Sequence, residues 1–294
     1  MDEFSTILRA RQLANEAGVN SAPVDIQKYL KVPSINAVLR VDYDLLADQA
    51  GSTTLIKDRH CIFVNGCHSR ERQRFTVLHE IGHIVLNIPS SHSKHLKTQD
   101  LYSYRKKPKE EILCDVFAAE LLLPEALFRQ DVLRTQIGFD GIETLASNYE
   151  TSLTSTGSRF AVLNEEPCAF ILSEAGKVRY VSYSRDMREQ KSWISIGLTI
   201  PNDTLTVARL KGHKEEGPVE IEAHQWLENE TRKGRYILED VRLLEQWNQS
   251  LTLIWFENAE YREHENSTQE EYEEEPGLQE LDGSLPWPSK RRRR

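Results

Sequence analysis

The spacing of apolar and polar positions divides the first half of the chain into helical and strand-like segments. Apolar residues recur every three or four positions over 5–18, 70–87 and 108–123, which predicts a helix in each range. Ser5 is the expected N-cap of the first helix, and Pro23 is the expected start of a short second one. The β-branched runs SINAVLRV, STTLIK and HCIFVN then predict a small antiparallel sheet.

The second half repeats this mixture of patterns. Residues 128–134 continue in helical period, and two short helical patterns meet near Thr151, with Ser152 as a cap, in the outline of a helix-turn-helix. CAFIL and VRYVSYS around SEAGK predict a hairpin, and LTLIWF predicts a further strand. We therefore expect an α+β protein with four parts: a zincin-like domain over 1–135, a helix-turn-helix-like segment over 136–164, a second α+β domain over 165–256 and a disordered acidic tail over 257–294.

Composition narrows the possible partners. No apolar run approaches the roughly 18 residues of a membrane span, and no signal peptide is recognisable, so we expect a cytoplasmic protein whose four cysteines stay free. The net charge is −9, of which residues 257–294 carry −5. This leaves no broad basic surface for nucleic acid, although the terminal SKRRRR could bind a polyanion or fold back on the acidic run.

The segment FTVLHEIGHIVLN places three ionisable side chains, two histidines and a glutamate, in an otherwise apolar helical run. His79 and His83 are four residues apart, so both imidazoles leave the helix on one side and can bind one ion. Glu80 lies near that ion but is better placed to take a proton from water. Gly82 allows another element to approach the helix closely. A chance coincidence of two core histidines and a glutamate is the alternative, but their burial without a cation would be costly.

The best third ligand lies on the helix EEILCDVFAAELLLP. Glu111 and Asp115 share one face of it, so Glu111 can bind the ion while Asp115 accepts a hydrogen bond from a ligand histidine. Glu110 is the second choice of ligand. Alternatively, Glu111 and Asp115 could both be solvated on the outer face of the helix. His92 and His95, in a polar loop, are either surface residues or part of a lid.

Three protein ligands and one open position are typical of a catalytic zinc ion, with Mn²⁺ or Fe²⁺ as alternatives for the same nitrogen and oxygen donors. Such a site hydrolyses an activated carbonyl, with Glu80 shuttling the proton. The strand HCIFVN could pair with an extended peptide, which favours a peptide bond as the substrate.

The stretches IFVN, RQRFTVLHEIGH and EEILCDVFAAELLLP, followed by IETLASNYETSLTSTGSRFAVL and PCAFILSEAGKVRY, resemble the ImmA/IrrE family of zincin-like metallopeptidases. The resemblance covers residues 5–185 well and 186–256 loosely. It implies His79, His83 and Glu111 as zinc ligands, Glu80 as the catalytic carboxylate and Asp115 at the family's Asp/Asn position. Many members have a glutamate where this chain has Leu113.

The resemblance further implies cleavage of a helix-turn-helix repressor, in a bacterial stress response or in control of mobile elements. Residues 165–256 would correspond to the GAF-like sensor domain of longer members. Two other functions stay open: DNA binding through Ser152–Leu163, which holds one basic residue, Arg159, and partner binding without turnover in a toxin–antitoxin pair. The sequence does not determine the oligomeric state.

Overall fold

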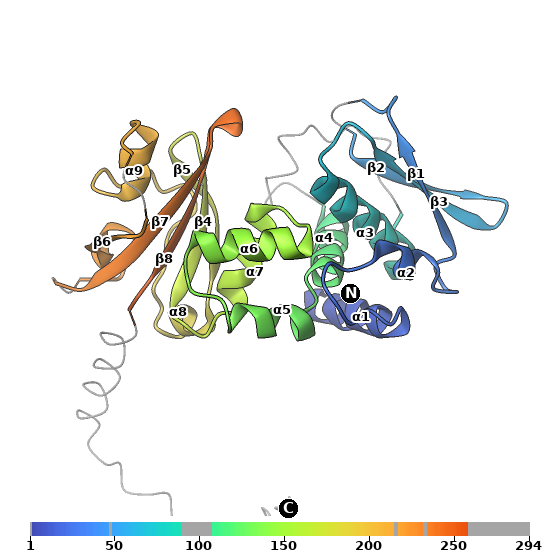
Figure 1. The fold of residues 1–294 in the computed structure, drawn as a ribbon, viewed down its shortest axis with the longest axis horizontal. Helices are drawn as coiled ribbons and strands as arrows, with labels where there is room; N and C mark the ends of the chain where they lie inside the picture. The colour runs from blue at the N-terminus through green and yellow to red at the C-terminus, as the bar shows by residue number, and fades with distance from the viewer. Residues whose placement is uncertain (1, 47–48, 90–107, 215–216, 232–233, 258–294) are drawn as a thin grey trace, which may run out of the picture. The chain divides into compact units, whose positions relative to one another are not determined.

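The computed structural model describes residues 2–46, 49–89, 108–214, 217–231 and 234–257, which form helices and two sheets (Figure 1). The described elements are α1 Glu3–Glu16, α2 Ile26–Leu30, β1 Ala37–Asp42, β2 Gly51–Ile56, β3 Arg59–Asn65, α3 Arg70–Leu86, α4 Lys109–Leu122, α5 Glu125–Val132, α6 Phe139–Tyr149, α7 Leu153–Leu163, β4 Cys168–Glu174, β5 Lys177–Tyr183, α8 Arg185–Glu189, α9 Leu205–Leu210, β6 Val219–Glu222, β7 Tyr236–Leu244 and β8 Gln249–Trp255. The expected α+β class is confirmed. Among the described helices, none is both long and apolar enough to cross a membrane.

The first sheet has the strand order β1-β3-β2. A two-residue turn, in which Lys57 and Asp58 both have positive φ, joins β2 to an antiparallel β3. β1 is parallel to β3, so the expectation of a wholly antiparallel sheet is wrong for that pair. After β1 the chain leaves room for one strand before it forms β2, and β3 then occupies the place between β1 and β2. HCIFVN is therefore the central strand, with β1 and β2 on its two sides, and has no free edge that could pair with a peptide, contrary to the expectation from the sequence.

Two predicted helix starts are also displaced. The first helix begins at Glu3, because Asp2 rather than Ser5 is the N-cap, and the Asp2 side chain accepts from the Ser5 backbone N–H. The second helix begins at Ile26 after the cap Asp25, three residues beyond Pro23. The predicted helices over 70–87 and 108–123 are confirmed as α3 and α4.

The second sheet is antiparallel, with the order β5-β4-β8-β7-β6. Helices α6 and α7 lie between this sheet and the α3–α4 pair (Figure 1). Ser152 caps α7 as predicted, and the SEAGK turn joins β4 to β5. Gly157 allows α7 to lie directly against the Phe170 ring of β4, because a Cβ atom at this position would overlap the ring. The domain division and the GAF-like assignment stay predictions, and His92, His95 and residues 258–294 lie outside the described residues.

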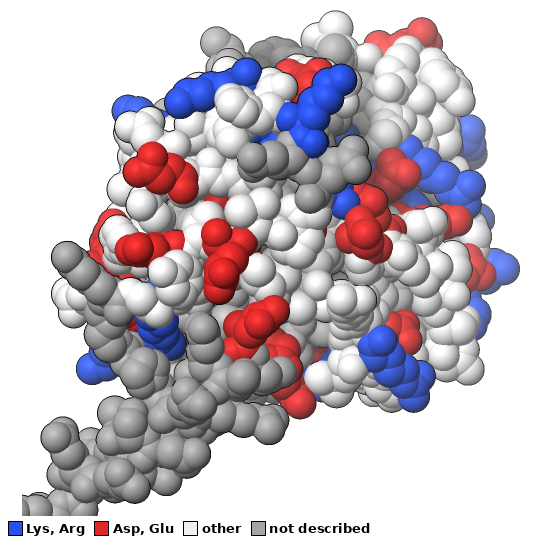
Figure 2. All heavy atoms as spheres, turned by 60° about the vertical axis from the view of Figure 1, so that its left-hand side comes forward, with Lys and Arg blue, Asp and Glu red and all other residues white. Residues whose placement is uncertain are grey.

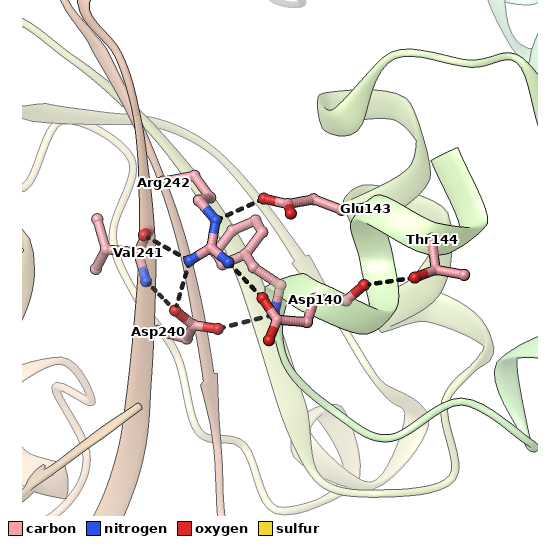
Figure 3. Close-up of polar contacts among 7 residues, drawn as sticks. Asp140, Glu143, Thr144, Asp240, Val241 and Arg242 are labelled. Carbon is pink, nitrogen blue, oxygen red and sulfur yellow. Dashed lines mark hydrogen bonds and ion pairs between the residues drawn. The ribbon is translucent and has the colours of Figure 1, made fainter. Parts of the chain in front are cut away.

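A polar network ties α6 to the second sheet (Figure 3). Asp240 of β7 accepts a hydrogen bond of 2.8 Å from the Phe139 backbone N–H, which caps α6 because Gly138 has no side chain to do so. Arg242 donates to Asp140 at 2.7 Å and to Asp240 at 3.1 Å. Since Asp240 is 5% exposed, its loss would leave a buried N–H without an acceptor.

We predict that Asp240→Ala lowers the free energy of unfolding by about 1–3 kcal/mol, because it removes the acceptor of a buried backbone donor. Urea unfolding followed by circular dichroism measures the change. Asp140→Ala is the matched control: its side chain is 97% exposed, so its ion pair contributes under about 1 kcal/mol. Equal losses from the two variants would contradict the capping role of Asp240.

Candidate metal centre

Helix α3 carries His79, Glu80 and His83 near its C-terminal end. The Ser69 side chain caps its start, and Asn87, in the left-handed region with φ 53°, ends it. His83 is 4% exposed, the His79 side chain is 12% exposed, and Glu80 is fully buried. Both imidazoles point to one place because they lie one turn apart.

Helix α4 crosses directly over α3 at Gly82. A Cβ atom at this position would lie 3.3 Å from the Cys114 Cα and 3.4 Å from the Phe117 ring. The missing side chain therefore sets the distance between the helices, as the sequence indicated. This contact brings Glu111 and Asp115 of α4 to the histidines, both buried, whereas Glu110 is exposed.

Three side-chain atoms form a small triangle at the crossing. His79 Nε2 lies 3.1 Å from His83 Nε2 and 3.1 Å from Glu111 Oε2, and His83 Nε2 lies 3.6 Å from the same oxygen. Tetrahedral zinc with bonds of about 2.0–2.2 Å to nitrogen and oxygen holds its ligand atoms about 3.3 Å apart. The residues present therefore fit a zinc ion, in both donor type and spacing.

The other ring nitrogens have their own partners. His79 Nδ1 lies 2.9 Å from Asp115 Oδ1, and His83 Nδ1 lies 3.1 Å from the Ile88 carbonyl oxygen. Both partners accept hydrogen bonds, so a ring that binds a metal would donate from Nδ1 and present the Nε2 lone pair to the crossing. Asp115 thus occupies the position expected of a carboxylate that fixes a ligand tautomer.

The carboxylates also determine the charge of His79. Burial lowers its pKa, but hydrogen bonds to Asp115 and Glu111, with the charges of Asp115 and Glu80, outweigh burial and raise the pKa to about 9. Without a metal, the ring is therefore an imidazolium at neutral pH. A divalent cation would take the place of its proton.

Sequence reasoning did not single out Cys114, which the structure places at the same crossing. Its Sγ and the His79 and His83 nitrogens lie within 4.8 Å of one another, a group that can hold a metal. Burial and then the neighbouring carboxylates raise the pKa of this thiol, which keeps it protonated. Glu111 lies at 3.1 and 3.6 Å from the same two nitrogens, so the crossing offers two third donors, of which the protonated thiol is the weaker ligand. Only the helix crossing reveals Cys114, because no metal-ligand spacing includes it.

Glu80 lies beside the triangle and faces the first sheet. Its Oε2 accepts a hydrogen bond of 2.7 Å from the Thr53 hydroxyl of β2. Sequence reasoning also missed Thr53, because β2 and α3 become neighbours only through the fold.

Three comparisons show which known proteins this chain is similar to. Residues 39–160 match the IrrE N-terminal-like domain family, Peptidase_M78. The radiation response metalloprotease IrrE of Deinococcus radiodurans is 30% identical over 122 residues, which are 39% of this chain and 34% of that protein. The chain thus matches about a third of this relative's length. A Mycobacterium tuberculosis transcriptional regulator has a similar fold, with a TM-score of 0.56 and 12% identity over 86% of this chain and 76% of its own.

These findings assign residues 39–160 to the class of zincin-like domains found in metallopeptidases, with a group of side chains that can hold a metal. The protein carries a domain of the IrrE N-terminal-like family over residues 39–160, and its resemblance to the ImmA/IrrE family is confirmed. The transcriptional regulator, at 12% identity, adds a likeness of fold alone.

We predict that zinc binding releases a proton and tightens with pH. The folded pKa of His79, about 9, is above the ordinary value of 6.5, so a proton must leave the ring wherever the pH is below about 9. The apparent zinc affinity should rise about tenfold per pH unit between about 6.5 and 9 and then level off. Competition with a chromogenic chelator measures it. A flat profile over this range would contradict the raised pKa.

We also predict that Gly82→Val forces α3 and α4 apart. The branched side chain would overlap the Cys114 backbone, which should cost about 1–3 kcal/mol in unfolding free energy and weaken zinc binding by roughly tenfold or more. Gly82→Ala is the control, because a single Cβ needs only a slight shift and alanine favours the helix. Thermal unfolding and zinc titration test both variants, and tight zinc binding by Gly82→Val would refute the role of the crossing.

Proposed function

We propose that this protein is a zinc-dependent endopeptidase that cleaves a helix-turn-helix transcriptional repressor at a specific site. The observation that carries the proposal is the triangle of His79, His83 and Glu111 beside the buried carboxylate of Glu80. Mn²⁺ or Fe²⁺ would suit the same donors. The proposed location is the cytoplasm, and four free cysteines are consistent with it.

Each residue has a distinct task in the proposed reaction. His79, His83 and Glu111 would hold the ion, while Asp115 orients His79. A bound zinc ion supplies Lewis-acid activation of water and of the scissile carbonyl. Glu80 takes the proton from the attacking water and gives it to the leaving amine, so that the peptide bond breaks without a free hydroxide or an amide anion.

The peptide would bind along β2. This strand is an edge of the first sheet, because β3 is its one partner among the described strands. An extended peptide can add to such an edge through backbone hydrogen bonds. The Thr53–Glu80 hydrogen bond places this edge beside the proposed base, so β2 takes the role that the sequence had suggested for HCIFVN.

DNA binding by α7 receives less support. All residues of α7 are buried or half-buried, because the helix packs against α5, α6, β4 and β5. Its single basic residue, Arg159, forms an ion pair with the buried Glu120 of α4. The face in Figure 2 shows groups of Asp and Glu over its described residues and no continuous basic surface. A groove-reading helix needs exposed side chains that reach bases and phosphates.

We predict that Glu80→Gln keeps zinc and loses cleavage by about 10²–10⁴-fold, because the amide cannot accept the proton. The assay incubates the zinc-loaded protein with the repressor encoded beside its gene and identifies fragments by mass spectrometry. Glu110→Gln is the matched control, since Glu110 is exposed one residue from Glu111 and should retain activity.

The same assay separates the rival functions. Stable binding of the repressor without fragments, by the wild type as by Glu80→Gln, would instead favour a partner-binding protein of the toxin–antitoxin kind. Salt-dependent binding of promoter DNA by the isolated chain would favour a DNA-binding regulator.

A further inference from the structure

Strand β2 approaches α3 closely at two matched positions. A Cβ atom on Gly51 would lie 2.6 Å from the Thr76 Cγ2, so the strand contacts the helix there. From Gly51 to Thr53 the strand advances about 6.7 Å, and from Thr76 to Glu80 the helix advances about 6 Å. The second contact, the hydrogen bond of 2.7 Å between the Thr53 hydroxyl and Glu80 Oε2, therefore follows from the first.

The direction of the Thr53 side chain is fixed by the sheet. Because side chains alternate along a strand, Thr53 points to α3 and Thr54 to the opposite face. Thr53 pairs with Ile62 of the central strand β3, a fully buried residue, so its backbone is held on that side. A threonine hydroxyl placed in this way is a rigid donor, because branching at Cβ restricts rotation about χ1.

Glu80 needs such a donor. Its side chain has three rotatable bonds, and a general base must hold its carboxylate within hydrogen-bond reach of the proton that it takes. A hydrogen bond to one oxygen fixes the rotation of the whole group, so the carboxylate is oriented before substrate arrives.

We propose that Thr53 is a positioning residue that orients the Glu80 carboxylate from the strand that receives the substrate. The inference rests on the proposed function. It makes β2 serve two purposes, since its outer edge would pair with the peptide while the Thr53 side chain, on the α3 face, holds the base. Docking of a peptide on this edge then places the scissile bond against a carboxylate that the same strand has oriented.

The test compares Thr53→Val, which keeps the branched shape without the hydroxyl, with Thr53→Ser, which keeps the hydroxyl. With the repressor as substrate, Thr53→Val should lower kcat about tenfold while KM and zinc affinity stay within about twofold, because a lost hydrogen bond to a charged group has an effect of this size. Thr53→Ser should restore kcat to within about threefold of the wild type. Loss of zinc in Thr53→Val, or equal kcat in Thr53→Val and the wild type, would overturn the proposal.

A second readout needs no turnover. Acetohydroxamic acid binds zinc and transfers its hydroxyl proton to a neighbouring carboxylate. Its affinity for the zinc-loaded protein therefore depends on the placement of Glu80, and calorimetry measures that affinity. Thr53→Val should weaken it about tenfold, whereas Thr54→Val, the same change on the opposite face, should not. In a Glu80→Gln background, Thr53→Val should have no further effect, because the two changes act on one interaction. Additive effects would overturn the proposal.

The two arms also separate this inference from the proposed function. A wild-type protein that cuts no repressor would refute the peptidase function, and the hydroxamate cycle would still decide whether Thr53 positions Glu80.

Discussion

The contact between α3 and α4 at Gly82 brings the residues of the candidate metal centre together. The histidines belong to one helix and the third donor to the other, so their nitrogen and oxygen atoms meet only if the helix axes approach closely. With no side chain at Gly82, Cys114 and Phe117 rest directly on the α3 backbone. Glu111, about one turn before Cys114, then reaches both imidazoles, and Asp115, directly after Cys114, reaches His79. The raised pKa of His79 is the electrostatic result, because burial lowers it but the hydrogen bonds to Asp115 and Glu111, with the nearby charge of Glu80, outweigh burial.

Local patterns were enough to predict much of the fold. The periods that defined α3, α4, α7 and the β4–β5 hairpin reflect short-range geometry, which a sequence records directly. The wrong predictions concern positions where two residues compete as helix caps, and strands whose pairing depends on contacts distant in the sequence. Asp2 outcompetes Ser5 as a cap three residues away, and no local feature states that β3 enters between β1 and β2. Strand order depends on where a connection crosses, and hydrophobic alternation does not encode that.

The residues of the candidate site likewise divide into those that the sequence predicted and those that only the fold brings together. His79, Glu80 and His83 lie within one helical turn and a half, so their spacing alone brings them together. Glu111 and Asp115 required the further assumption that two apolar helices pack, and the structure brings both to the histidines. Thr53 and Cys114 could not be predicted, because a threonine on a strand and a cysteine on an apolar helix face have no distinctive spacing. Their proximity to Glu80 and the histidines is a property of tertiary packing alone.

The second half of the molecule is joined through α6 to α3, the helix that carries His79, Glu80 and His83. Asp240 and Arg242 of the second sheet hold the start of α6, and Glu150, directly after its end, forms ion pairs with Arg70 and Arg74 of α3 at 3.1 and 3.2 Å. The second hydrophobic core is likewise shared, because Phe139 and Phe160 of the helices pack with Phe170 and Leu253 of the sheet. Helices α6 and α7 therefore bury their apolar faces against the sheet rather than against each other alone. Removing residues 165–256 would expose those faces to water and remove the cap of α6, the helix that is followed by the Glu150 ion pairs with α3.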